Sequence, residues 1–177
     1  MADDLGYGDL SCYGSERIRT PKLDELAGEG IRLTSFYSGC TICTPSRMAL
    51  LTGAYPRRLG WRGGVVGYRI KPNNGLSPDA VTIAEVFQGA GYRTAMIGKW
   101  HLTGYRHHDA EYEVRPTEHG FDWNFASEVK GVGNGANFWP YVFRDQSIRW
   151  IDIPENRLGK GEYLTDREAV EACAFIE

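Results

Sequence analysis

A cysteine four residues ahead of an arginine is the first feature of the sequence that could carry chemistry. Cys43 stands just before Pro45, a residue favoured at the start of a helix. The backbone dipoles at a helix N-terminus stabilise an anion and lower the pKa of a thiol placed there. Arg47 lies about one turn further along and can reach the same face. The spacing therefore predicts an activated cysteine beside a cation, at a helix terminus suited to binding an anion.

The elements that must position these residues alternate between helix and strand. Prolines and apolar periodicity predict helices at 21–29, 45–51, 82–89 and from 165 onward, and strands at 31–37 and 92–97. Thr20 is expected to cap the first of these helices, and capping boxes are expected at Thr82 with Glu85 and at Thr165 with Glu168. Residues 60–78 and 102–161 are rich in glycine, proline or aromatic residues and predict irregular loops, with short strands at 141–143 and 148–151. The alternation is typical of an α/β fold with a largely parallel sheet.

In such sheets the functional site lies beyond the carboxyl ends of the strands. Lys99 and His101 directly follow the strand expected at 92–97. Asp3 and Asp4 would lie at an equivalent end if a strand preceded them. In isolation these would be a solvated lysine, a packed histidine and two loop carboxylates. Their positions at strand ends favour the functional interpretation.

Five segments, in this order, resemble the formylglycine-dependent sulfatases, the arylsulfatase-like branch of the alkaline phosphatase superfamily. They are Asp3–Asp9, Thr20–Gly30, Cys43–Gly53, Gly91–Leu102 and His119–Asp122. The resemblance implies part of an alkaline-phosphatase/sulfatase-like sandwich, with a mostly parallel sheet flanked by helices. It implies that residues 1–177 are the N-terminal part of the catalytic domain, truncated at both ends, because the chain opens as if inside a strand.

The resemblance also implies the chemistry. Cys43 would be oxidised to formylglycine (3-oxoalanine) by a formylglycine-generating enzyme, within the modification motif Cys43-Thr44-Pro45-Ser46-Arg47. One hydroxyl of its hydrate would attack the sulfur of a sulfate ester, and the other would then expel sulfate as the aldehyde re-forms. Asp3, Asp4 and the modified Cys43 would bind a divalent cation, Ca²⁺ with Mg²⁺ as the alternative.

The resemblance assigns roles to three further side chains. Arg47 would hold the nucleophile, and Lys99 would contact the sulfate as a point charge. His101 would orient the formylglycine hydrate or assist its deprotonation. The family pattern continues with a second histidine, an Asp-Asn pair and a further lysine that have no match here. Two carboxylates and Cys43 alone would leave Ca²⁺ short of its usual six to eight or so oxygens.

Two other functions compete with sulfate ester hydrolysis. One is hydrolysis of phosphonate or phosphate esters by an enzyme of the same superfamily, and the other is an inactive truncated fragment. Cys40 and Cys43 also form a C-x-x-C pair, which could be a redox pair or half of a zinc site. No second such pair exists in the sequence, which argues against zinc. His107-His108 has no partner residues and is interpreted as an exposed loop.

Composition excludes several classes of protein. Of 177 residues, 42% are hydrophobic and 24% are charged, which indicates a folded domain. The net charge is −3 without a basic block, so nucleic acid is not an expected partner. The apolar runs are far shorter than the roughly 20 residues of a membrane-spanning helix. The resemblance favours a periplasmic or secreted protein, acting on an aryl, sugar or polysaccharide sulfate.

Overall fold

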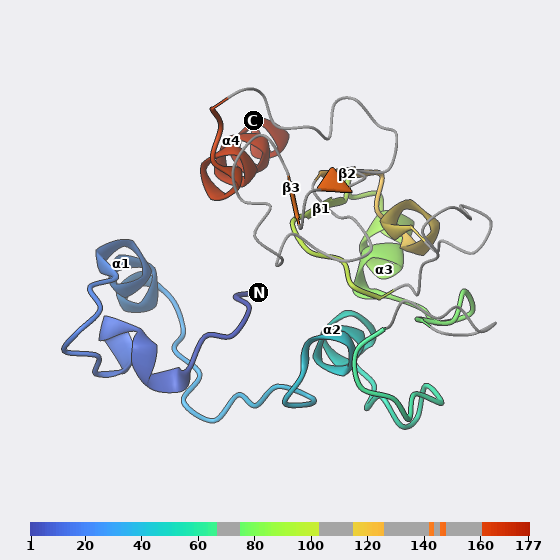
Figure 1. Ribbon diagram of the computed structural model, residues 1–177, viewed down its shortest axis with the longest axis horizontal. Coiled ribbons are helices and arrows are strands. Elements are labelled where there is room, and N and C mark those ends of the chain that lie inside the picture. The colour runs from blue at the N-terminus through green and yellow to red at the C-terminus, as the bar shows by residue number, and fades with distance from the viewer. Residues whose placement is uncertain (67–74, 103–114, 126–141, 144–145, 148–160) are drawn as a thin grey trace. The chain divides into compact units, whose positions relative to one another are not determined.

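The computed structural model describes residues 1–66, 75–102, 115–125, 142–143, 146–147 and 161–177 (Figure 1). The chain divides into two units, Met1–Tyr37 and Ser38–Glu177, and each is described by itself. None of the helices in these described ranges is long and apolar enough to cross a membrane.

The N-terminal unit is built around one helix and two short 3-10 turns. These are η1 (Tyr7–Asp9), η2 (Ser11–Tyr13) and α1 (Pro21–Glu29). Helix α1 confirms the predicted range 21–29. Thr20, however, does not cap it through its side chain. Its hydroxyl lies 2.7 Å from the Ser11 hydroxyl and donates to Asp24 at 3.2 Å, so it ties η2 to the first turn of α1.

The strand predicted at 31–37 is wrong. This segment is irregular and contains a turn at Thr34–Ser35. Side chains from both faces of the expected strand are exposed, including Ile31 at 88% and Phe36 at 70%. Alternation identifies the face that a strand would bury, but a strand also needs a neighbour to pair with its backbone. No described residue forms such a pairing with this segment.

The second unit contains the helices and the parallel strands. In chain order its elements are α2 (Cys43–Thr52), α3 (Ile83–Gly89), β1 (Ala95–Ile97), η4 (Pro116–His119), β2 (Trp123–Phe125), β3 (Val142–Phe143), β4 (Gln146–Ser147) and α4 (Leu164–Ile176). Strands β1 and β2 pair in parallel, with Ala95 opposite Trp123 and Ile97 opposite Phe125. Strands β3 and β4 form a short antiparallel pair. The mixed α/β class with a parallel sheet is confirmed.

Local sequence signals explain most of the helix ends. Gly53 ends α2 in the left-handed conformation, with φ at 65°. Thr82 and Glu85 form the predicted capping box at α3, through bonds of 3.2 and 2.6 Å. The capping box predicted at Thr165 is wrong. Helix α4 begins one residue earlier, at Leu164, and its N-cap makes no side-chain bond.

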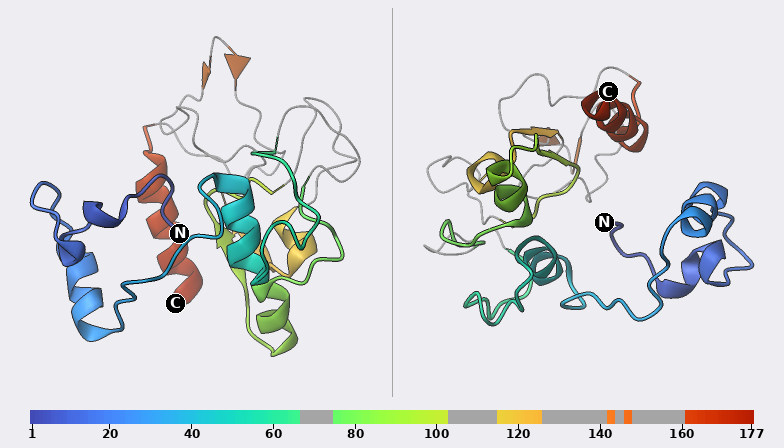
Figure 2. Two further views of the ribbon diagram at one scale, coloured as in Figure 1. Left: turned by 90° about the horizontal axis from the view of Figure 1, so that it is seen from below. Right: turned by 180° about the vertical axis from the view of Figure 1, so that it is seen from behind.

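Helix α4, which is drawn in red in Figure 2, packs against strand β1. Phe175 of α4 stacks on Trp123 of β2, with ring centroids 6.4 Å apart and ring planes at 6°. The Arg93 guanidinium lies over the same Phe175 ring, 5.6 Å from its centroid. A cation over an aromatic face and two stacked rings both favour this packing.

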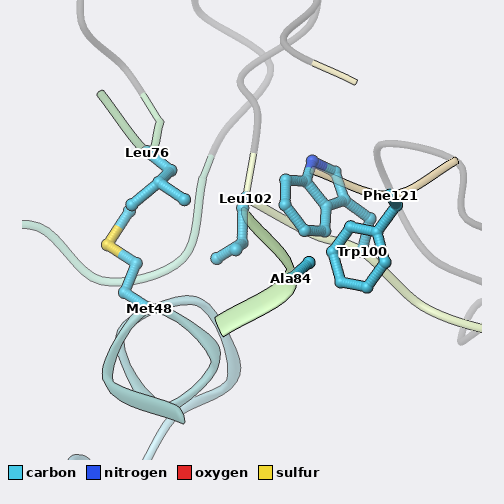
Figure 3. Packing of buried hydrophobic residues seen from close by; sticks show 6 residues of the cluster. All are labelled: Met48, Leu76, Ala84, Trp100, Leu102 and Phe121. Carbon is cyan, nitrogen blue, oxygen red and sulfur yellow. The ribbon is translucent and has the colours of Figure 1, made fainter. Parts of the chain in front are cut away.

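A compact apolar cluster forms the core of the second unit (Figure 3). Its buried members are Met48, Leu76, Ala84, Trp100, Leu102 and Phe121. They come from α2, the segment before α3, α3 itself, the segment after β1 and the turn after η4. Burying each large apolar side chain contributes about 1.5–3 kcal/mol. The cluster therefore fixes residues 99–102 against α2 and α3.

Candidate active site

The structure places Cys43 at the first position of α2. Ile42 is the N-cap, and the Ser46 amide donates to the Ile42 carbonyl at 3.2 Å, which closes the first turn. Cys43 is half-buried, whereas the next five residues of the helix are buried. The thiol therefore lies at the positive end of a ten-residue helix. The helix starts two residues earlier than predicted, which brings Cys43 inside its first turn.

The loop in front of Cys43 is fastened to the helix by hydroxyl groups. The Ser46 hydroxyl donates to the Cys40 carbonyl, and the Ser38 hydroxyl donates to the same carbonyl at 2.8 Å. Cys40 and Cys43 are both free thiols. Among the residues that the structure describes, no three His, Cys, Asp or Glu side chains gather as metal ligands would. The zinc interpretation of the C-x-x-C pair gains no support.

Arg47 connects α2 to the segment after β1. Its side chain is 7% exposed, and its Nη1 donates to the Lys99 carbonyl. Residues 99–101 leave the end of β1 and run past the first turn of α2. The structure thus brings Cys43, Arg47, Lys99 and His101, all predicted from the sequence, into neighbouring parts of one unit.

Thr44 makes a second connection between the same two segments. Its hydroxyl donates to the His101 carbonyl at 3.0 Å and accepts from the Val66 amide at 3.0 Å. Thr44 is completely buried. The sequence identified Thr44 only as a member of the modification motif, because nothing in local spacing reveals a bond to a residue 57 positions away.

His101 has an unusual backbone conformation. Its φ is 55°, in the left-handed region that non-glycine residues rarely occupy. Such a conformation costs about 1–3 kcal/mol and persists only where surrounding contacts impose it. The flanking Trp100 and Leu102 are 1% and 0% exposed, so both neighbours are anchored in the core. Backbone strain held by a packed core is typical of functional positions.

Asp3 and Asp4, the predicted cation ligands, belong to the N-terminal unit. Both residues are exposed, and Asp4 also has a left-handed backbone, with φ at 56°. Their role in binding a cation stays a prediction.

His119 was identified only as part of a family-like turn, yet it is a buried neighbour of the site. It is completely buried, and its ring centroid lies 5.7 Å from that of Trp100. Burial lowers the pKa of His119, while the charges of Glu85 and Glu118 oppose this shift. Burial therefore disfavours the charged form of this imidazole, which packs against Trp100.

Glu168 of α4 approaches the start of the same segment, and the sequence analysis missed this contact. A Cβ atom added to Gly98 would lie 3.4 Å from the Glu168 Oε1. Burial raises the pKa of Glu168. Gly98 has φ at 90°, so its backbone suits glycine at the point where α4 comes close. No local pattern could have revealed an approach between residues so far apart in the chain.

Comparison with known proteins adds an independent line of argument. The sulfatase family model matches residues 1–154. Steryl-sulfatase of Rattus norvegicus is 46% identical over 163 residues, covering 90% of this chain and 28% of that protein. Arylsulfatase A of Homo sapiens is 53% identical over 104 residues, covering 58% of this chain and 20% of that protein.

Solved structures agree with these matches. The crystal structure of Ps i-CgsB superimposes with a TM-score of 0.75 at 28% identity, covering 98% of this chain and 39% of that one. The structure of BT4656 in complex with its substrate D-glucosamine-2-N,6-O-disulfate gives a TM-score of 0.64, also at 28% identity, covering 98% of this chain and 29% of that one. The chain thus spans well under half the length of these relatives. It belongs to the sulfatase family.

Proposed function

We propose that this chain supplies the nucleophile and part of the anion site of a sulfuric ester hydrolase. The observation that carries the proposal is the meeting of two segments. The first turn of α2 bears Cys43 and Arg47, and Arg47 is bonded to the backbone of Lys99. The nucleophilic position and Arg47 thus lie on one turn of α2, next to the segment that carries Lys99, and cleavage of an anionic ester requires such a nucleophile with cations near it.

The described residues fit a formylglycine at position 43. Cys43 is a free, half-buried thiol at a helix N-terminus, where backbone N–H groups favour an oxygen nucleophile that develops negative charge. When present, formylglycine supplies a hydrated aldehyde with two hydroxyls on one carbon. Arg47 places a permanent positive charge one turn away. Lys99 offers a point charge to a sulfate oxygen, and His101 offers a nitrogen that can hold or release a proton.

Burial of the modification motif bears on its maturation. Thr44, Ser46 and Arg47 are 0%, 7% and 7% exposed. An enzyme that reads these side chains needs them outside the folded core. We therefore expect a formylglycine-generating enzyme to act before α2 packs. Separately, the family resemblance favours a mature protein that is periplasmic or secreted.

A divalent cation, Ca²⁺ or Mg²⁺, is part of the proposal but not of the steps derived above. Asp3 and Asp4 are suitable hard ligands, but two carboxylates do not fill a coordination sphere of about six to eight oxygens. On this proposal Asp3 and Asp4 supply part of the cation site, and other ligands complete it.

The test compares esters on the longest natural form of the protein, matured in a host with formylglycine-generating activity. We expect turnover of 4-nitrophenyl sulfate that is lost in Cys43→Ala and kept in Cys40→Ala, a matched change at the neighbouring thiol. Faster turnover of a phosphate or phosphonate ester would favour the other hydrolase of the superfamily. The 177-residue chain alone is expected to show little or no activity, and robust turnover by it would contradict the partial-site account.

A further inference from the structure

We propose that Thr44 is a positioning residue, whose hydroxyl fixes the strained backbone of His101 against the start of α2. The inference rests on the proposed function, because it gives His101 a role at the site. It goes further because it gives the Thr44 side chain a structural role in addition to its place in the modification motif.

The Thr44 hydroxyl makes its hydrogen bonds outside its own helix. Its hydroxyl uses both its donor and an acceptor position, on the His101 carbonyl and the Val66 amide, each at 3.0 Å. A threonine in the middle of a helix can bond the carbonyl one turn earlier. Thr52, in the same helix, does this by donating to Met48 at 2.7 Å. Thr44 instead joins three segments that are distant in sequence.

Thr44 and Arg47 act as a pair on the same side of the contact. They lie three residues apart on α2, which corresponds to about 4.5 Å along the helix axis. Their partners, the carbonyls of His101 and Lys99, lie two residues apart in the segment after β1. The short Thr44 side chain and the long Arg47 side chain therefore hold the two segments together at two points.

The contact also reaches a backbone in a strained conformation. His101 has φ at 55°, between two fully anchored core residues, Trp100 and Leu102. The bond from Thr44 reaches the carbonyl of that same strained residue. A change in this backbone would re-aim the imidazole, and a displacement of about 1 Å at a reacting group can cost about 100-fold in rate.

The experiment uses the full-length protein with formylglycine content measured by mass spectrometry, so that rates are expressed per aldehyde. Thr44→Val removes the hydroxyl at nearly constant shape, Thr44→Ser keeps it, and Thr52→Val is the matched control in the same helix. We expect Thr44→Val to lower kcat about tenfold or more with a smaller change in KM, and to shift the pH profile of kcat. We expect Thr44→Ser to stay within about threefold of wild type, and Thr52→Val to match wild type.

A second readout does not depend on activity. The Val66 amide is buried and bonded to the Thr44 hydroxyl, so its hydrogen exchange should accelerate in Thr44→Val and not in Thr44→Ser. Wild-type kcat per aldehyde in Thr44→Val, equal losses in the Ser and Val variants, or unchanged exchange at Val66 would each overturn the proposal. If Thr44→Val does not fold, Thr44→Ala against Thr52→Ala takes its place under the same criteria.

Different results would refute the proposed function and the role of Thr44. A wild-type protein with full aldehyde content and no turnover of sulfate esters would refute the proposed function. In that case the exchange of the Val66 amide still decides whether Thr44 holds the segment, because it needs no substrate.

Discussion

Gly120→Ala is expected to destabilise the protein more than its conformation alone explains. Gly120 follows η4 with φ at 81°, and its amide donates to the Pro116 carbonyl. A Cβ atom there would lie 2.4 Å from the Glu85 nitrogen and 2.6 Å from the Glu85 Cα. Both are backbone atoms of the first turn of α3, so a side-chain rotation cannot relieve the clash. Moving them would disturb the capping box that Glu85 forms with Thr82.

The expected loss of unfolding free energy in Gly120→Ala has two parts. The left-handed backbone of an alanine costs about 1–2 kcal/mol, and forcing an extra methyl group into a packed site costs about 1–3 kcal/mol. We therefore expect Gly120→Ala to lower the free energy of unfolding by about 2–5 kcal/mol. Gly91 is the matched control, because its φ is 86° and no heavy atom lies within 4 Å of an added Cβ. Gly91→Ala should therefore lower the free energy of unfolding only by the backbone cost of a left-handed alanine, about 1–2 kcal/mol.

Urea unfolding of the full-length variants, followed by tryptophan fluorescence, measures the difference. Equal slopes allow the two midpoints to be compared directly. A loss at Gly120 that exceeds the loss at Gly91 by about 1–3 kcal/mol supports the close approach of the turn to α3. Equal losses at the two glycines would refute it.

Three further outcomes follow from the same structure. Burial lowers the pKa of His119 below its ordinary 6.5, so the unfolded chain binds the proton more readily than the folded one. The free energy of unfolding should therefore fall as pH drops below about 6.5. In urea midpoints measured from about pH 5 to 8, His119→Phe should weaken this dependence on pH. Burial raises the pKa of Glu168 above its ordinary 4.5, so ionisation of this carboxyl opposes folding as pH rises. Glu168→Gln should therefore raise the urea midpoint at about pH 7 and leave it unchanged at about pH 4. Arg47→Lys loses the planar fork bonded to Lys99 and should lower kcat per aldehyde by about 10²–10³ in the 4-nitrophenyl sulfate assay.

The sequence predicted best those elements whose signals are local. Pro21 marks the start of α1, Gly53 marks the end of α2, and the capping box at Thr82 marks the start of α3. Each signal acts within one helical turn, so neighbouring residues suffice to recognise it. Cys43, Arg47, Lys99 and His101 were proposed as site residues from motif spacing and position after a strand, and their roles stay predictions.

Features that depend on distant parts of the chain were not predictable in this way. The alternation at 31–37 could not reveal that the segment has no strand beside it among the described residues. Strand β2 (Trp123–Phe125) lies in a stretch interpreted as loops, because only its pairing with β1 defines it. The bond between Thr44 and His101 likewise depends on the way the core brings α2 and residues 99–102 together.

The central claim is that Cys43 becomes the nucleophile, and one mass spectrum tests it most directly. The tryptic peptide from Leu33 to Arg47 contains both Cys40 and Cys43. It should be taken from the longest natural form of the protein, made in a host with formylglycine-generating activity, beside a matured sulfatase of known sequence. We expect an aldehyde at Cys43 and an intact thiol at Cys40. An unmodified Cys43, or a disulfide between the two cysteines, with the control sulfatase fully converted, would contradict it.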